Sequence, residues 1–196
     1  EYCYDDYVSV TCGYDWREPT NEETETIENL IKSVIPIKEE RELYLQILCT
    51  GIDGRCLEKF IIFNGCGGNG KGVMNDLMSV CVGNYGMIGN NGILFENSKT
   101  GSNPEKSNLH KKRFIVFKNP NEKNKIKNSI ITELNTVVIE CEHTLLFDEE
   151  LETNKIIDIQ FNNSVDEIFK TEEFKQKHKF AFMKILLEEH IKYSKN

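Results

Sequence analysis

The chain of 196 residues has 39% hydrophobic residues and a net charge of −8. This length and hydrophobic content suffice for one sizeable core, so we expect one structural domain. A pI near 5.2 excludes a surface that attracts nucleic acid as a whole, and contact with phosphate backbones would depend on a local basic patch.

The cysteine pattern and the apolar runs indicate a protein of the cell interior. No C-x-x-C pair occurs, which argues against a disulfide framework and against a protein-held zinc ion. No apolar run approaches the ~18 residues of a membrane helix, and the N-terminus lacks the features of a signal peptide. The chain begins at Glu1 rather than Met, which suggests a piece of a longer protein. The seven cysteines are Cys3, Cys12, Cys49, Cys56, Cys66, Cys81 and Cys141.

Two helices are predicted ahead of the first strand. Thr20 and Glu23 form a T-x-x-E capping box before apolar residues at helical spacing, and Pro36 ends that run. The second helix is predicted over residues 38 to 50, with Gly51 as its C-terminal cap. Together they make a small helical lead-in.

A glycine-rich loop follows the first predicted strand directly. Residues 60 to 63, FIIF, form a short apolar run typical of a strand buried on both faces. After the loop, apolar residues repeat at helical spacing until Gly83. The order strand, glycine loop, helix is the context in which such a loop binds phosphate. The predicted loop residues are Gly65, Cys66, Gly67, Gly68, Asn69, Gly70, Lys71 and Gly72.

The residue types of this loop suit a nucleotide. Glycines let successive backbone N–H groups point at phosphate oxygens, and the start of the helix adds its positive dipole end. Lys71 is placed to reach the outer phosphates. Two alternatives remain open, an ordinary glycine-rich turn and a chemically inactive descendant of a phosphate loop.

The remaining pattern predicts an α/β fold with a parallel sheet flanked by helices. Short β-branched runs at 114–117, 137–139 and 156–159 predict further strands. A helix is expected around 127–134, and a long amphipathic helix over 171–193. We divide the chain into a lead-in at 1–55, a P-loop ATPase core at 56–165 and a C-terminal helix at 166–196, within one structural domain.

Several motifs resemble the superfamily 3 helicase domain of poxvirus-type primase-helicases of large DNA viruses. They are GCGGNGKG, GNYGMIGNN, SNPEKSNLHKKRFIVFKNP, VVIEC and IIDIQF, and the opening DYVSVTCGYDW resembles the segment leading into that domain. The likeness weakens after about Phe161. It implies an AAA+-like P-loop NTPase fold, a ring of six subunits, ATP with Mg²⁺ as cofactors, and DNA drawn through the ring.

The resemblance assigns the nucleotide to the loop and makes Lys71 its key cation, but two metal-binding positions depart from the family pattern. Gly72 lacks the hydroxyl that contacts Mg²⁺, although water can take that ligand position. Asn119 stands where the family has an acidic residue that orders Mg²⁺ and the attacking water. Glu122, just downstream, is a candidate substitute; the alternative is a solvated loop acid. The metal site is therefore expected to be weakened.

Other departures concern the terminal phosphate and the DNA. Glu142 replaces a phosphate-sensing Asn, and Asn154 and Lys155 replace arginines that reach a neighbouring subunit's nucleotide. The family's insert with the DNA-gripping hairpin is missing, because Leu134 is followed within three residues by the strand at Val137. The remaining candidates for DNA contact are Lys111, Lys112 and Arg113, and the alternative is a solvated turn.

Three functional interpretations follow from the sequence. The first is an ATP-binding helicase module of DNA replication with impaired hydrolysis and unwinding, in the replication compartment of a host cell if the source is viral. The second is a non-catalytic relative that joins a homo- or hetero-hexameric ring as a nucleotide-binding subunit. The third is a P-loop phosphotransferase, which the scarcity of arginines outside the basic cluster disfavours.

Overall fold

A computed structural model describes residues 10–95, 104–150 and 152–194. Its centre is a sheet of five parallel strands in the order β2-β3-β5-β1-β7, which confirms the predicted α/β class. The first nine residues of the lead-in, and Ser102 and Asn103 of the SNPE motif, lie outside the described residues. The strands are β1 (Phe60–Asn64), β2 (Gly86–Ile88), β3 (Phe114–Lys118), β5 (Thr136–Cys141) and β7 (Ile156–Gln160).

The central strands are apolar throughout because both faces of the sheet are covered. Successive side chains of a strand point to opposite faces, so β1 divides its residues between two cores. Ile61 and Phe63 belong to the core under the large helical layer, whereas Phe60 and Ile62 belong to the core on the other face. The four predicted apolar runs are confirmed as strands; β2, which is short, was not predicted.

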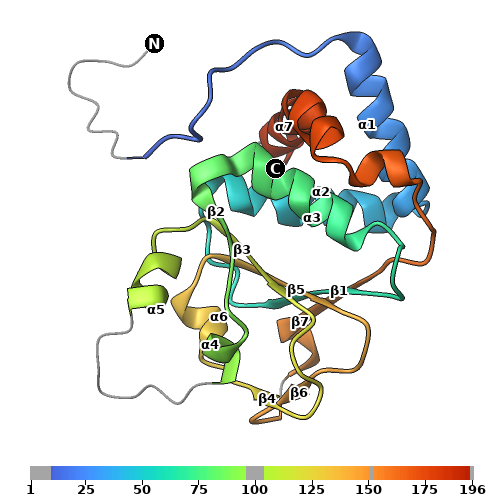
Figure 1. The fold of residues 1–196 in the computed structure, drawn as a ribbon. Coiled ribbons are helices and arrows are strands. Elements are labelled where there is room, and N and C mark those ends of the chain that lie inside the picture. The colour runs from blue at the N-terminus through green and yellow to red at the C-terminus, as the bar shows by residue number, and fades with distance from the viewer. Residues whose placement is uncertain (1–9, 96–103, 151, 195–196) are drawn as a thin grey trace.

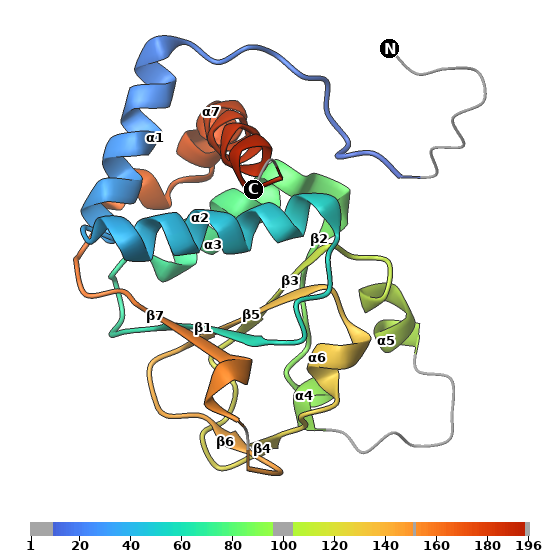
Figure 2. The same cartoon turned by 180° about the vertical axis from the view of Figure 1, so that it is seen from behind.

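Four helices lie on one side of the sheet, two of them next to it and two packed on those from outside (Figure 1 and, from behind, Figure 2). The C-terminal helix α7 contacts each of the other three, and all four contribute to the same core. The predicted helices of the lead-in, of the loop and of the C-terminus are thereby confirmed. The helices are α1 (Asn21–Val34), α2 (Lys38–Asp53), α3 (Lys71–Val82) and α7 (Glu172–Tyr193).

The other face carries shorter elements, drawn below the sheet in Figure 1. The helix expected over 127–134 is one turn, α6 (Ile130–Glu133). Strands β4 (Lys125–Ile126) and β6 (Leu146–Phe147) pair in a second, two-stranded sheet. Helices α4 (Gly92–Phe95) and α5 (Pro104–Leu109) also pack on this face. The 3-10 helices are η1 (Gly83–Tyr85) and η3 (Glu167–Lys170), which pack on the side of the long helices, and η2 (Thr153–Lys155), which precedes β7.

The C-terminal cap of α2 is Gly54, so the prediction of Gly51 was wrong. Gly51 lies inside the helix, where a Cβ would approach Met78 and Phe114 to 3.0 and 3.1 Å. Its lack of a side chain therefore permits α2 to pack closely against α3 and β3. Gly54 adopts the left-handed conformation with φ of 77°, which ends the helix.

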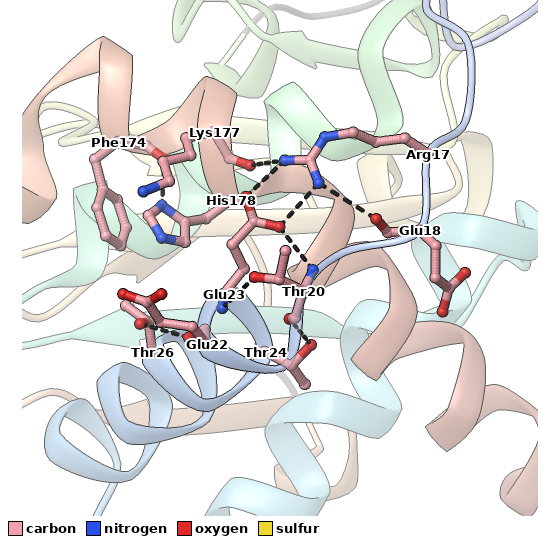
Figure 3. A network of polar contacts seen from close by, with 10 residues as sticks. All are labelled: Arg17, Glu18, Thr20, Glu22, Glu23, Thr24, Thr26, Phe174, Lys177 and His178. Carbon is pink, nitrogen blue, oxygen red and sulfur yellow. Dashed lines mark hydrogen bonds and ion pairs between the residues drawn. The ribbon is translucent and has the colours of Figure 1, made fainter.

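The N-terminus of α1 is fixed by the predicted capping box. The Thr20 hydroxyl accepts a hydrogen bond from the Glu23 amide, and the Glu23 carboxylate accepts one from the Thr20 amide. Arg17 adds two bonds of 2.8 and 2.7 Å to the same carboxylate (Figure 3). Arg17 also donates to the carbonyl oxygen of Lys177 on α7, so the capping network ties the lead-in to the C-terminal helix.

Candidate nucleotide-binding site

The glycine loop connects β1 to α3 in a conformation that requires glycine. Gly65, Gly68 and Gly70 have φ values of 147°, 80° and 90°, which side chains disfavour. A Cβ at Gly65 would collide with the Asn69 side chain and with the Phe161 carbonyl oxygen. At Gly68 it would meet nothing within 4 Å, so the loop is open to the outside there.

The segment after β7 holds the loop in place. The buried Asn69 side chain donates a hydrogen bond to the Phe161 carbonyl oxygen, and the Val165 amide donates one of 3.2 Å to the Gly68 carbonyl oxygen. The Phe161 amide donates to Asn64 at the end of β1. The loop is therefore preorganised by the fold rather than by its own glycines alone.

Lys71 lies in the first turn of α3 and is only 3% exposed. Its ammonium donates to the carbonyl oxygens of Gly65 and Cys66 and to Asn69 Oδ1. An ammonium has three donors, so the loop's own oxygens satisfy all of them. The loop thus encloses the Lys71 ammonium at the N-terminal end of α3, and helix N-termini favour the binding of phosphate.

A cavity of about 300 Å³ opens over this loop. Besides the loop, its walls come from α3, from β5 and from the region around the start of α7. The charged residues that line it are Lys71, Asp76, Glu140, Glu142, Lys170 and Lys175. Three cations and three carboxylates therefore surround the space next to the loop.

Two of the lysines in this region are already paired. Asp76 on α3 forms ion pairs of 2.7 Å with Lys118 at the end of β3 and of 2.9 Å with Lys175 on α7. Burial raises the pKa of Asp76, but the bonds and charges of the two lysines outweigh burial and hold that pKa below its ordinary value. Asp76 thus stays ionised and links three elements beside the loop.

Asn119 and Glu122, the candidate catalytic positions, are both exposed and are not among the described residues that line the cavity. Asn119 follows β3 with φ of 43°, a conformation that Asn tolerates better than most residues. Its amide donates a 2.7 Å hydrogen bond to the Glu140 carbonyl oxygen. Asn119 therefore lies beside the end of β5, and Glu122 lies further along the same turn.

The positions expected to act on the terminal phosphate fall at opposite edges of the sheet. Glu142 follows β5 at the loop edge, and a Cβ at Gly67 would lie 3.5 Å from its Oε1. Asn154 and Lys155 precede β7, which is parallel to β1. They therefore lie at the edge away from the loop of their own chain.

The basic cluster before β3 is partly engaged in packing. Arg113 donates a 2.7 Å hydrogen bond to the Ile52 carbonyl oxygen and stacks 4.1 Å over the Tyr85 ring. Lys112 donates to the Asn84 carbonyl oxygen at 2.6 Å. Lys111 is exposed, and it lines a separate hollow together with Lys112. Arg113 is thus a structural residue, and the two lysines are the accessible charges of this cluster.

Sequence reasoning missed Glu140, Asp76 and Lys175 as residues of the cavity. The signal for Glu140 was present, since it is a charged residue inside the otherwise apolar run VVIEC. Period-two alternation puts it on the same face as Val138, which packs in the core with α3. Asp76 and Lys175 carried no such signal, because charged residues are ordinary on helices.

The described residues contain no group of three or more His, Cys, Asp or Glu side chains that could hold a metal ion by themselves. This agrees with the way proteins bind Mg²⁺ beside a nucleotide, through one or two carboxylates together with phosphate oxygens and waters. The residues present fit such an ion at one point, the Glu140 carboxylate beside Gly72. Gly72 and Asn119 supply no carboxylate.

The parallel sheet, the strand-loop-helix unit and the flanking helices define a P-loop NTPase fold. No helix among the described residues is long and apolar enough to cross a membrane. No family model matches the chain, and no curated protein matches it.

Solved structures with a similar fold include the A form apo structure of the NrS-1 C-terminal region, with a TM-score of 0.62 and 17% identity over 90% of this chain and 47% of that one. A second structure, of NrS-1 residues 305–718, has a TM-score of 0.61 and 16% identity and covers 90% of this chain and 46% of that one. The JCV helicase has a TM-score of 0.50 and 8% identity, and the match covers 90% of this chain and 61% of that one. The chain therefore has a helicase-like fold and spans about half the length of the NrS-1 chains.

Proposed function

We propose that the chain is an ATP-binding module of the helicase type that acts in DNA replication and hydrolyses ATP slowly. The observation that carries the proposal is the fixed glycine loop around Lys71, open to a cavity of about 300 Å³. Backbone amides, a helix N-terminus and a lysine are the groups that recognise phosphates in P-loop proteins. The fold shared with the JCV helicase supports the helicase type.

The departures near the cavity support slow hydrolysis. Asn119 is neutral and cannot accept a proton from water, and loss of such a group typically slows a reaction by about 10²- to 10⁴-fold. Glu142 adds negative charge where the terminal phosphate would lie. The proposal therefore separates nucleotide binding, for which the groups are present, from turnover, for which they are not. A non-catalytic ring subunit would retain the same binding.

Binding of a fluorescent ATP analogue to the purified chain tests the proposal. Lys71→Met should weaken binding by at least about tenfold, whereas Lys123→Met, an exposed lysine outside the cavity lining, should leave it unchanged. Equal affinities of the two variants, or no binding at millimolar nucleotide, would contradict the proposal.

A matched pair at Gly68 tests the same point without removing the bonds of Lys71. Asn and Asp both tolerate the left-handed conformation, and a side chain at Gly68 meets no neighbour. Gly68→Asp should bind ATP about tenfold more weakly than Gly68→Asn, because only the carboxylate repels phosphate. Equal affinities would place the phosphates away from this loop.

A further inference from the structure

Glu140 occupies the side of the cavity that the missing hydroxyl would face. It lies on the central strand β5 and is 9% exposed. A Cβ added to Gly72 would lie 3.6 Å from its Oε1. The residue without a side chain and the carboxylate are therefore direct neighbours, and Gly72 leaves one face of this carboxylate uncovered.

A second buried side chain orients this carboxylate. Asn75, one turn further along α3 and 1% exposed, donates from Nδ2 to Glu140 Oε2 at 3.1 Å. Oε1 accepts no hydrogen bond from the described residues, and the Asn75 Oδ1 atom is itself buried without a partner. The buried Asn75 Oδ1 thus lacks the donor that buried polar groups normally have, whereas Glu140 Oε1 lies on the cavity side, next to Gly72.

The other charges of the cavity do not neutralise Glu140. Lys71 turns its ammonium toward the loop's own oxygens, and Lys175 pairs with Asp76. Glu140 forms no ion pair with any residue in the described part of the chain. A buried carboxylate without a cationic partner is costly, and a metal ion would offset that cost.

From this geometry we infer that Glu140 is the carboxylate of this chain that binds the Mg²⁺ of a bound nucleotide. The inference rests on the proposed function, since the ion needs phosphate oxygens and waters for its remaining ligands. Glu140 would contact the ion beside Gly72, where the start of α3 lies next to the end of β5. Glu140 would thus supply the protein ligand to Mg²⁺ that neither Gly72 nor Asn119 can supply.

The experiment measures ATP affinity with excess Mg²⁺ and with EDTA, for wild type and for Glu140→Gln. In wild type Mg²⁺ should tighten binding by about tenfold or more, and in Glu140→Gln by no more than about twofold. Binding in EDTA should be equal or tighter in the variant, because a negative charge beside the phosphates is removed. The control is Glu150→Gln, which neutralises an exposed carboxylate outside the cavity lining and should keep the full Mg²⁺ effect.

A compensating variant separates metal binding from a merely structural role. Gly72→Ser fits beside Glu140, because its Cβ would be in ordinary contact, and it supplies the missing hydroxyl. Added to Glu140→Gln, it should restore about half or more of the Mg²⁺ effect on a logarithmic scale. If the Gln variant does not fold, Gly72→Ser alone in the wild-type background should raise the Mg²⁺ effect severalfold.

Mn²⁺ provides a readout that does not depend on nucleotide affinity. The electron paramagnetic resonance signal of Mn²⁺ with saturating ATP should change on adding wild-type protein and should change less with Glu140→Gln. An unchanged Mg²⁺ effect and an unchanged Mn²⁺ signal in that variant would overturn the inference. Lys71-dependent binding without a Mg²⁺ effect in wild type would also overturn it while leaving the proposed function intact. Absence of all nucleotide binding would instead refute the proposed function.

Discussion

The ends of β1 and β3 lie at the same edge of one parallel sheet and differ in what they offer a nucleotide. After β1, the chain forms a glycine loop that is anchored by Asn69 and closed around Lys71. At the end of β3 it presents Lys118, which pairs with Asp76, followed by Asn119, which is neutral and exposed. In the proposed function, phosphate binding depends on the end of β1 and phosphate transfer on the end of β3, so the chain could keep the first and lose the second.

The largest effect we expect is a complete lack of strand separation by this chain. Only residues 134 and 135 connect α6 to β5, and two residues span at most ~7 Å, too little for a hairpin that grips DNA. Asn135 also bonds to the Lys112 carbonyl oxygen, which fixes the connection to the protein. An ATP-dependent assay on a forked duplex measures this, and unwinding that Lys71→Met abolishes would show that another element grips the strand.

The next effect concerns the loop after β1. Gly65→Ala should lower the free energy of unfolding by about 3 kcal/mol or more, because its Cβ would collide with backbone and adds strain at positive φ. Gly68→Ala should cost only about 1 kcal/mol, since its Cβ is unobstructed. Urea unfolding of both variants measures the difference. Equal losses would mean that the loop is not held against Phe161.

A smaller effect, a gain in ATP turnover, is expected from a substitution just after β3. Asn119→Asp should raise ATP turnover by about tenfold, because it restores a carboxylate and Asp tolerates the observed positive φ. Steady-state phosphate release at saturating ATP measures it, with Asn121→Asp as a control for added charge in the same turn. Should the two variants turn over ATP at the same rate, the limiting damage lies at another position, such as Glu142.

The smallest expected effect is on the stability of the fold and comes from Glu23, which lies far from both strand ends and therefore provides a control. The hydrogen bonds from Arg17, opposed by burial, lower the pKa of Glu23 from 4.5 to about 2. The stabilisation is therefore complete above pH 4.5 and is lost as the pH falls toward 2. Glu23→Gln keeps the capping box and should cost about 1 kcal/mol at neutral pH after screening by solvent.

Denaturation curves taken from neutral pH downward test this dependence. The stability difference between wild type and Glu23→Gln should shrink below pH 4.5, because wild-type Glu23 then loses its charge as well. ATP affinity at neutral pH should be the same in both proteins. A difference that stays constant with pH would mean that the Arg17 interaction does not stabilise the fold.

The sequence by itself determined the elements whose signals are local. The capping box of Thr20 and Glu23, the strand-loop-helix unit around Lys71 and the apolar central strands follow from spacing and side-chain chemistry within a few residues. The parallel sheet followed as well, since strands buried on both faces need helices on both sides. Strand β2 and the single turn α6 were missed or misjudged, because their boundaries depend on packing rather than on local propensity.

Only the tertiary structure decided which charged groups meet at the loop. The strand order puts β5 beside β1 and thereby brings Glu140 next to Gly72, although they lie 68 positions apart in the sequence. The packing of α7 on α3 brings Lys175 to Asp76. Burial then decides what each charge can do, because a carboxylate at a solvated surface is ordinary, whereas a buried carboxylate without a cationic partner is costly.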